Sequence, residues 1–215
     1  MASLKLIFGG TFDPLHNGHL QLLLHLYQLL GTPISLLPLG GIPSYKAPPQ
    51  ASLAQRLEML HLIAAQYPEQ IEIDTSEALA PSYTPTYLSL QRLRQTHGSA
   101  AQLYFILGGD SLVSLDSWDH WRELFTLSNF IVALRPNYSL EQMTPQLKQQ
   151  VLPRLVPFPA TEVAGQIILT TFKPLAVSST QIRHHCAQGL NPSAMVNPEI
   201  ARYILTHNLY KEPKC

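Results

Sequence analysis

The sequence predicts an α/β protein built on an open parallel sheet with helices on both faces. Short apolar runs alternate with longer helical patterns, which is typical of parallel strands joined by crossover helices. Glycine and proline bound most of these runs, so the expected strands end in turns. The chain has 215 residues, of which 46% are hydrophobic and 13% charged, and this is enough to bury one full core.

The individual elements follow from this pattern in chain order. Strands are expected at residues 4–8, 34–37, 71–74, 103–107, 130–134 and 167–171. Helices are expected at residues 18–30, 53–66, from Pro85 onward, 179–187 and 198–207. Gly9 and Gly10 should break the first strand. The helix at 53–66 should bury a face made of Leu53, Leu57, Leu60 and Ala64. This alternation indicates a Rossmann-like sheet.

Residues 1–215 are expected to form a single domain. From 136 to 166 the sequence becomes polar, Gln-rich and interrupted by prolines, and we interpret this stretch as an irregular excursion from the sheet. Residues 172–215 should form a C-terminal helical part.

Composition argues against several classes of function. The chain has 14 basic and 14 acidic residues, so its formal net charge is zero, whereas proteins that bind long nucleic acids usually carry a basic excess. Cys186 and Cys215 have neither metal-ligand nor disulfide-framework spacing. No apolar run is long enough to span a bilayer, and the first residues lack the layout of a signal peptide. We expect a cytoplasmic monomer or homo-oligomer that acts on a small charged ligand, without nucleic-acid or membrane partners.

The segment 9–20 joins the first expected strand to the first helix. It contains the turn residues Gly9, Gly10, Thr11, Phe12 and Gly18. Paired glycines let backbone amides approach a phosphate, and a helix N-terminus adds free N–H groups and a positive dipole end. His16 and His19 are three residues apart, so both imidazoles can face one triphosphate. An isolated His-x-x-His is usually a chance pair, but ligands collect where a strand of an open sheet meets a helix.

A second polar turn precedes the helix at 179–187. Ser178 or Ser179 can cap this helix, and the hydroxyls and free amides of its first turn, including Thr180, can hold a phosphate. Arg183 lies one turn further on and supplies a charged fork. An ordinary capping box would have similar residues, so this turn alone does not indicate a ligand site. Together with the segment 9–20 it does.

Three more turns offer ligand contacts. Ser82, Tyr83 and Thr84 follow the third strand and can present amides and a hydroxyl to an anion. Gly108 follows the fourth strand and lets a nucleotide lie against the backbone, while Asp110 can accept from a ribose hydroxyl or hold the loop. Arg135 ends the fifth strand at the same edge.

These segments resemble a known superfamily. Residues 16–19, His-Asn-Gly-His, are similar to the His-x-Gly-His signature of nucleotidyltransferases. Residues 177–183 are similar to the superfamily's Ile-Ser-Ser-Thr-x-x-Arg signature, with Val177 in place of isoleucine. The doubled glycine before Thr-Phe-Asp-Pro resembles the nicotinate-nucleotide adenylyltransferase branch. The resemblance runs from residue 4 to residue 210 and is weakest between 136 and 166. The dehydrogenase pattern Gly-x-Gly-x-x-Gly is not present here, so hydride transfer is not supported.

The resemblance implies roles that the residues' own surroundings do not define. Lys46 matches a lysine that the family has in a Pro-Pro-His-Lys loop, although Tyr45 replaces the histidine. Ser82, Tyr83 and Thr84 match the turn that holds the pyridine carboxylate of the acceptor. Thr86 and Ala78, however, stand where the family often has aspartate and arginine.

Two further roles are implied near the fourth strand. Residues 108–112 resemble the family's Gly-x-Asp-Ser-Leu stretch, which brings Leu112 to the acceptor side of the site. Trp118 is implied to stack on the pyridine ring, while Trp121 packs inward.

The implied reaction joins the AMP part of ATP to nicotinate mononucleotide and releases pyrophosphate. The attacking phosphate monoester has a second pKa of about 6, so no general base is required. The expected charge-stabilising set is His16, His19, Lys46 and Arg183, with Mg²⁺ carried on the triphosphate and no dedicated protein metal site. Two alternatives stay open. One is a sibling transferase with another acceptor, such as nicotinamide mononucleotide, phosphopantetheine or a choline-type phosphate with CTP. The other is a regulator that binds ATP without turnover.

Overall fold

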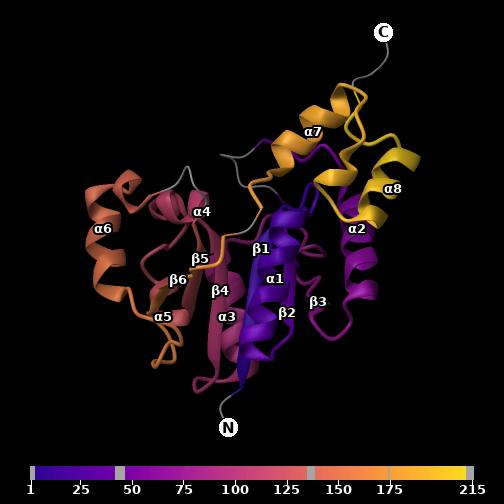
Figure 1. Cartoon of the computed structure of the whole chain (residues 1–215). Coiled ribbons are helices and arrows are strands. Elements are labelled where there is room, and N and C mark those ends of the chain that lie inside the picture. The colour runs from indigo at the N-terminus through magenta and orange to yellow at the C-terminus, as the bar shows by residue number, and fades with distance from the viewer. Residues whose placement is uncertain (1–2, 42–46, 135–138, 174, 212–215) are drawn as a thin grey trace.

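The computed structural model describes residues 3–41, 47–134, 139–173 and 175–211. Within these residues one six-stranded sheet has the order β3-β2-β1-β4-β5-β6, and every neighbouring pair is parallel. The strands are β1 (Leu4–Gly10), β2 (Ile34–Pro38), β3 (Ile71–Ile73), β4 (Gln102–Gly108), β5 (Asn129–Ala133) and β6 (Ile167–Leu169), as Figure 1 shows. This is the strand order of Rossmann sheets, so the expected fold class is confirmed.

The helices alternate with these strands along the chain. They are α1 (Asn17–Leu30), α2 (Leu53–Gln66), α3 (Thr86–His97), α4 (Gly109–Val113), α5 (Leu124–Leu127), α6 (Pro145–Val151), α7 (Ser179–Ala187) and α8 (Pro198–Thr206). Short 3-10 turns lie at Leu115–Ser117, Leu140–Gln142, Leu152–Arg154 and Pro192–Ala194.

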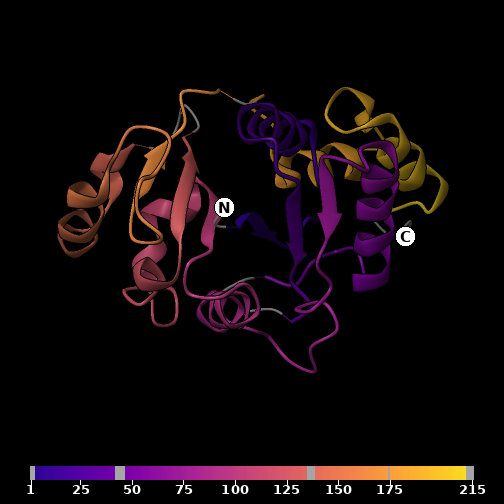
Figure 2. The same ribbon diagram turned by 90° about the horizontal axis from the view of Figure 1, so that it is seen from below.

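Apolar cores cover both faces of the sheet. Helices α1, α2, α7 and α8 bury Leu23, Met59, Ile182 and Ile200 against one face. Helices α3, α4, α5 and α6 bury Leu90, Leu112, Leu124 and Leu147 against the other. Figure 2 shows α1 and α3 on opposite sides of the strands. Since both faces are covered, β2 and β5 are buried along their whole length.

The first strand extends further than expected. Gly9 and Gly10 do not break β1 but continue it, in register with Leu37 and Pro38 of β2. The parallel ladder supplies their backbone partners, and this outweighs the weak strand preference of glycine. The carboxyl end of β1 therefore reaches the ligand edge of the sheet as ordered strand.

The buried face of α2 also differs from the expected one. The buried residues are Arg56, Met59, Leu60 and Ile63, whereas Leu53, Leu57 and Ala64 are half-buried. An arginine therefore occupies a position in the apolar stripe. A smaller difference concerns α3, where Pro85 is the N-cap and the helix begins at Thr86.

The polar stretch after β5 is less irregular than expected. Residues 139–166 contain α6, which begins with Thr144 as its N-cap and Pro145 in its first turn. Leu147 and Val151 of α6 are fully buried in the core on the α3 side of the sheet. The stretch thus packs onto the sheet, although its composition is polar (Figure 1).

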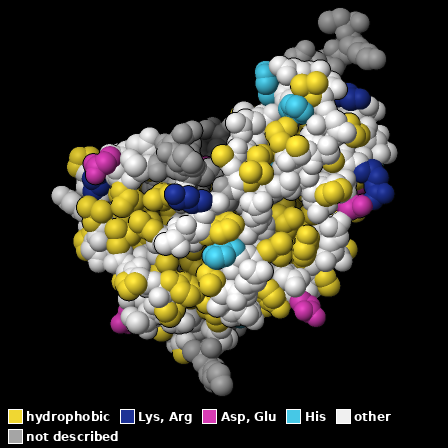
Figure 3. Space-filling model, in the orientation of Figure 1, with side chains coloured by type: hydrophobic (Ala, Val, Ile, Leu, Met, Phe, Trp, Pro, Cys, Tyr) yellow, Lys and Arg dark blue, Asp and Glu magenta, His cyan; other side chains and the backbone are white. Residues whose placement is uncertain are grey.

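Charged side chains are sparse on the face of the molecule seen in Figure 3, and at its upper left and right a basic and an acidic group lie next to each other. Among the described residues, no helix is both long and apolar enough to cross a membrane.

Candidate active site

A cavity of about 480 Å³ lies at the carboxyl ends of the strands. It adjoins the point where the chain order reverses, between β1 and β4, and this is where open α/β sheets bind ligands. Residues from both sequence motifs line it. The expected site residues on its wall are Gly9, Gly10, Thr11, Phe12, Gly18, His19, Tyr83, Gly108, Asp110, Trp118, Ser179, Thr180 and Arg183.

The glycines at the end of β1 are required by close packing. A Cβ added to Gly9 would lie 2.8 Å from Cζ of Phe105, and one added to Gly10 would lie 3.0 Å from the ring of Phe12. Gly18, at the start of α1, approaches the chain at Leu175, where a Cβ would lie 2.6 Å from the carbonyl oxygen. The absence of side chains lets the backbone itself form this wall of the cavity.

His16 and His19 meet as expected, but they are not equivalent. Their rings stack with centroids 3.5 Å apart and an angle of 15° between the planes. His19 lines the cavity, whereas His16 is buried and is the N-cap of α1. Nδ1 of His16 accepts from the backbone amide of His19 at 3.3 Å. A neutral His16 therefore carries its proton on Nε2. His16 is thus buried beside His19, and the expectation that both imidazoles face the ligand stays a prediction.

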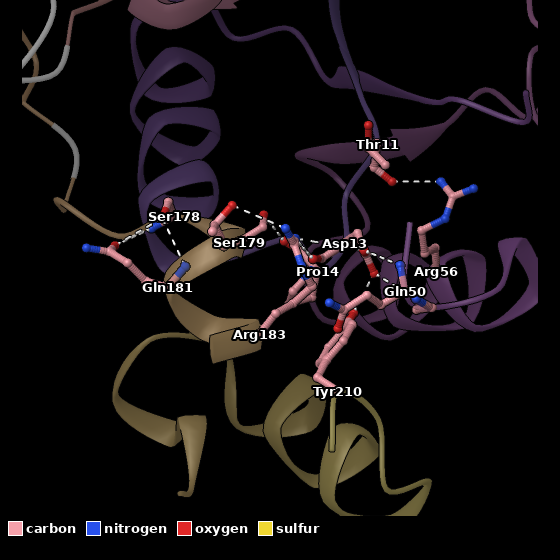
Figure 4. Close-up of polar contacts among 12 residues, drawn as sticks. Thr11, Asp13, Pro14, Gln50, Arg56, Ser178, Ser179, Gln181, Arg183 and Tyr210 are labelled. Carbon is pink, nitrogen blue, oxygen red and sulfur yellow. Dashed lines mark hydrogen bonds and ion pairs between the residues drawn. The ribbon is translucent and has the colours of Figure 1, made fainter. Parts of the chain in front are cut away.

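The second motif both caps a helix and reaches the first motif. Ser178 caps α7 by accepting from the amide of Gln181 at 3.2 Å, and it does not line the cavity. The hydroxyl of Ser179 donates to the carbonyl oxygen of Pro14 at 2.9 Å. Ser178 therefore forms the capping box of α7, whereas the next residue, Ser179, lines the cavity (Figure 4).

Arg183 joins the two motifs. Its Nη1 donates to the carbonyl oxygen of Asp13 at 2.7 Å, and its Nη2 donates to Oγ1 of Thr180 at 3.2 Å. The same Nη1 lies 3.8 Å from Oδ2 of Asp13. The guanidinium is thus fixed at the cavity wall by one carbonyl and one hydroxyl, with a carboxylate nearby.

Asp13 is a buried junction that the sequence analysis interpreted only as part of a turn. Its Oδ2 accepts from the amide of Gln50 at 2.8 Å, and its Oδ1 accepts from the amide of Ala51 at 3.1 Å and from the hydroxyl of Tyr210 at 2.9 Å. Burial raises the pKa of the Tyr210 hydroxyl above its usual value, and the charge of Asp13 adds to the rise. The first motif is therefore tied to the start of α2 and to the C-terminal segment.

The expected acceptor side is only partly at the cavity. Tyr83 lines it, but Ser82 and Thr84 do not, and Ser82 is exposed. The loop ending at Gly41 passes so close to Tyr83 that a Cβ at Gly41 would lie 2.2 Å from the Tyr83 amide nitrogen. Thr86, one of the departures from the family pattern, also lines the cavity.

Glu77 lines the same part of the cavity and was not expected there. It accepts a hydrogen bond from the hydroxyl of Ser89 on α3. Burial raises the pKa of the Glu77 carboxyl to about 7; Asp74 contributes to the rise, while Ser89 and Arg92 oppose it. No pattern in the sequence distinguishes Glu77 from an ordinary surface glutamate.

The end of β4 turns directly into helix. Gly108 is the N-cap of α4, and Gly109 is the first residue of the helix. A Cβ at Gly108 would lie 2.5 Å from Oδ1 of Asp110. Leu112 is fully buried in the apolar core and does not line the cavity, and its implied place on the acceptor side of the site stays a prediction.

The two tryptophans have different surroundings. Trp118 is half-buried on the cavity wall, with its ring edge-on to Phe105 at 6.5 Å. Trp121 is buried, and the guanidinium of Arg122 lies 4.3 Å from the centre of its ring. Trp118 is thus free to offer a ring face to a ligand, whereas Trp121 packs inward.

Two expected site residues, Lys46 and Arg135, lie outside the described residues. In the part of the chain that the structure describes, no group of three or more His, Cys, Asp or Glu side chains could hold a metal ion.

Comparisons with known proteins agree with this arrangement. The family model described as cytidylyltransferase-like matches residues 7–185. The chain is 35% identical to a protein from Pectobacterium atrosepticum named probable nicotinate-nucleotide adenylyltransferase, over 98% of this chain and 100% of the relative. It is also 35% identical to a Chromobacterium violaceum protein of the same name, over 95% of this chain and 97% of the relative.

Solved structures share the fold. The nicotinic acid mononucleotide adenylyltransferase of Plasmodium falciparum, complexed with NaAD, matches with a TM-score of 0.75 and 20% identity, over 97% of both chains. The same enzyme complexed with APC matches with a TM-score of 0.72 and 20% identity over the same shares.

Proposed function

The chain belongs to the nicotinate-nucleotide adenylyltransferase family, and on that premise we propose that it transfers the adenylyl group of ATP to nicotinate mononucleotide. The products are nicotinate adenine dinucleotide and pyrophosphate, a step of NAD biosynthesis. The observation that carries the proposal is one cavity lined by both motifs, through His19 and Arg183, and by the aromatic residues Tyr83 and Trp118.

The reaction is a displacement at phosphorus. A phosphate oxygen of the mononucleotide forms a bond to the α-phosphorus of ATP, and the bond from that phosphorus to the bridging oxygen breaks. Pyrophosphate leaves with the electron pair. Because the attacking phosphate is already largely ionised at neutral pH, the protein needs no general base. Its contribution is to align two polyanions and to stabilise the charge on the equatorial oxygens.

The cavity residues suit this task. We propose that His19 and Arg183 stabilise the α-phosphate of the transferred adenylyl group, and that His16 orients His19 through the ring stack and the helix cap. Gly9, Gly10, Thr11, Phe12, Gly18, Gly108, Asp110, Ser179 and Thr180 would contact ATP, and Ser178 would act as the cap of α7. Lys46 is proposed as a further cation of this set.

The acceptor is proposed to lie against Tyr83 and Trp118, with Ser82 and Thr84 nearby, and Arg135 is proposed as a further acceptor contact. The resemblance and the cavity position of Tyr83 and Trp118 support this assignment. Leu112, a buried residue of α4, would support the acceptor side from the core.

We infer that Mg²⁺ accompanies ATP. Of the three carboxylates on the cavity wall, Asp13 already accepts three hydrogen bonds and Glu77 accepts one from Ser89, so an ion near Asp110 would keep phosphate oxygens and waters as its other ligands. Bound there, the ion would neutralise phosphate charge. We further propose that residues 1–215 act as one nucleotidyltransferase domain and, since ATP and mononucleotides are made inside cells, that the reaction occurs in the cytoplasm.

A donor and acceptor panel tests the proposal. With ATP as donor, kcat/KM is expected to be higher for nicotinate mononucleotide than for nicotinamide mononucleotide. A site of donors leaves the carboxamide NH₂ facing N–H groups, which costs about 1–3 kcal/mol. CTP in place of ATP and phosphopantetheine in place of the mononucleotide should give little product. Equal use of the amide would overturn the acceptor assignment, and product from none of these pairs would overturn the transferase assignment.

A further inference from the structure

Arg56 occupies an unusual place for a charged residue. Only 2% of it is exposed, and it lies in the first turn of α2 among Met59, Leu60 and Ile63. Burying a guanidinium costs free energy, and the positive end of a helix dipole disfavours a cation there. Burial lowers the pKa of Arg56, and the negative charge of Asp13 opposes that shift. A residue that goes against these local preferences indicates a specific role.

The guanidinium connects two loops at the ligand edge. Its Nη1 donates to the carbonyl oxygen of Thr11 at 2.7 Å, and its Nη2 donates to the carbonyl oxygen of Leu39 at 2.9 Å. Thr11 follows β1 and Leu39 follows the neighbouring β2, and both residues line the cavity. Figure 4 shows Arg56 and Thr11 facing each other across this bond. Two carbonyl dipoles that would repel a triphosphate are thereby directed at a buried cation.

The loop between β1 and α1, inside the first motif, needs such support. Phe12 has φ 50°, a left-handed conformation that residues other than glycine rarely adopt. The carbonyl before it, on Thr11, is held by Arg56, and the carbonyl after it, on Asp13, is held by Arg183. The strained residue is therefore fixed on both sides by arginines from different helices.

The charges around this loop are also unbalanced. Arg56, Arg183 and Asp13 form a set of two cations and one carboxylate, which has a net charge of +1. Arg56 is buried, so water screens its charge less than that of a surface cation. A polyanion in the cavity would experience this field without touching the guanidinium.

We propose that Arg56 is a positioning residue for the triphosphate of the nucleotide donor, a role that rests on the proposed function. It holds the Thr11 and Leu39 carbonyls away from the phosphates, fixes the left-handed turn at Phe12 and contributes buried positive charge behind the loop.

Arg94 provides a matched control. It also binds backbone carbonyls, those of Gly98, Ser99, Ala101 and Leu127, and burial also lowers its pKa. It differs in that none of those four residues lines the cavity. Loss of Arg94 removes a comparable set of bonds from a region without a proposed ligand.

The test is calorimetric titration of the full-length protein with ATP and, separately, with adenosine. Arg56→Met is expected to weaken ATP binding by about tenfold or more, and to change adenosine binding by no more than about twofold, because adenosine lacks the phosphates that the loop positions. Arg56→Lys, which keeps the charge and loses the fork, should fall between Arg56→Met and the unmodified protein. Arg94→Met should lower thermal stability without changing the ATP-to-adenosine ratio.

An equal loss for both ligands in Arg56→Met, or an unchanged ATP affinity, overturns the proposal. If Arg56→Met does not fold, Arg56→Lys decides: an ATP-selective loss supports the positioning role, and no selective loss overturns it. Since binding is measured without turnover, these results stand apart from the proposed function, which fails only if the unmodified protein makes no dinucleotide.

Discussion

The hydroxyl of Tyr210 donates to Oδ1 of Asp13 at 2.9 Å and so joins two residues that are 197 positions apart. Both side chains are buried. The bond connects the C-terminal segment to the loop that carries the first motif, one residue from the left-handed turn at Phe12.

Tyr210→Phe is therefore expected to destabilise the protein. It removes a buried hydrogen bond to a carboxylate, which is worth about 1.5–3 kcal/mol. Tyr203→Phe is the control, because the Tyr203 hydroxyl also donates to a carboxylate, that of Glu58, but in an exposed pair worth less than about 1 kcal/mol. Urea unfolding of the two variants measures the difference. Equal losses of unfolding free energy would show that the Asp13–Tyr210 bond stabilises the protein no more than the exposed Tyr203–Glu58 bond does.

His19→Ala should reduce kcat far more than it changes the KM for ATP. A group that stabilises developing charge acts mainly in the transition state, and its loss typically costs about 10²–10³ in kcat. His25→Ala is the matched control, because His25 lies on the same helix, stacks on Phe172 and does not line the cavity. Steady-state kinetics of both variants provide the measurement. An unchanged kcat in His19→Ala would remove His19 from the catalytic set.

Trp118→Ala should raise the KM for the mononucleotide by about two- to tenfold and leave the KM for ATP nearly unchanged, because an aromatic contact is worth about 0.5–1.5 kcal/mol. Trp118→Phe keeps a flat ring and should recover much of the loss. Trp121→Phe, in the core, should instead lower the melting temperature and affect both substrates alike. If Trp118→Ala behaves like Trp121→Phe, the indole of Trp118 is a packing group.

The fold could be predicted because the sheet is buried on both faces, which makes each strand an apolar run with clear ends. The prediction failed where tertiary contacts outweigh local preference. Gly9 and Gly10 continue β1 because β2 supplies their partners, and Arg56 is buried because two carbonyls receive it. Arg56, Met59, Leu60 and Ile63 have the i, i+3, i+4, i+7 spacing of one helix face, so the sequence does contain a pattern that predicts a buried arginine. The spacing of the leucines favoured a different face.

The sequence could predict only those site residues that lie close together in the chain. His19, Thr180 and Arg183 stand in compact motifs, and the structure brings them to one cavity. Asp13, Glu77 and Tyr210 depend on contacts between distant segments, which local patterns do not reveal. The position of Leu112 inside a family stretch did not reveal that its side chain is buried in the core.

Stability should depend on pH through Glu77. Its pKa is raised to about 7 in the folded protein against an ordinary value of 4.5. The unfolded chain therefore loses this proton at lower pH than the folded protein does, and the stabilisation present below pH 4.5 is lost as the pH rises toward 7. The difference is on the order of 3 kcal/mol, since each pKa unit corresponds to about 1.4 kcal/mol.

Glu77→Gln removes this titration, so the decline in unfolding free energy between pH 4.5 and 7 should be shallower in the variant than in the unmodified protein. Urea unfolding at intervals across that range measures both slopes. Parallel curves would mean that the Glu77 carboxyl is not buried in the protonated form.

The most direct test of adenylyl transfer is the fate of labelled ATP incubated with the protein, Mg²⁺ and nicotinate mononucleotide. With the label on the α-phosphate, we predict that it appears in nicotinate adenine dinucleotide and that one pyrophosphate is released for each dinucleotide formed. Label that stays in ATP, or that is released as AMP or ADP without dinucleotide, would contradict the account.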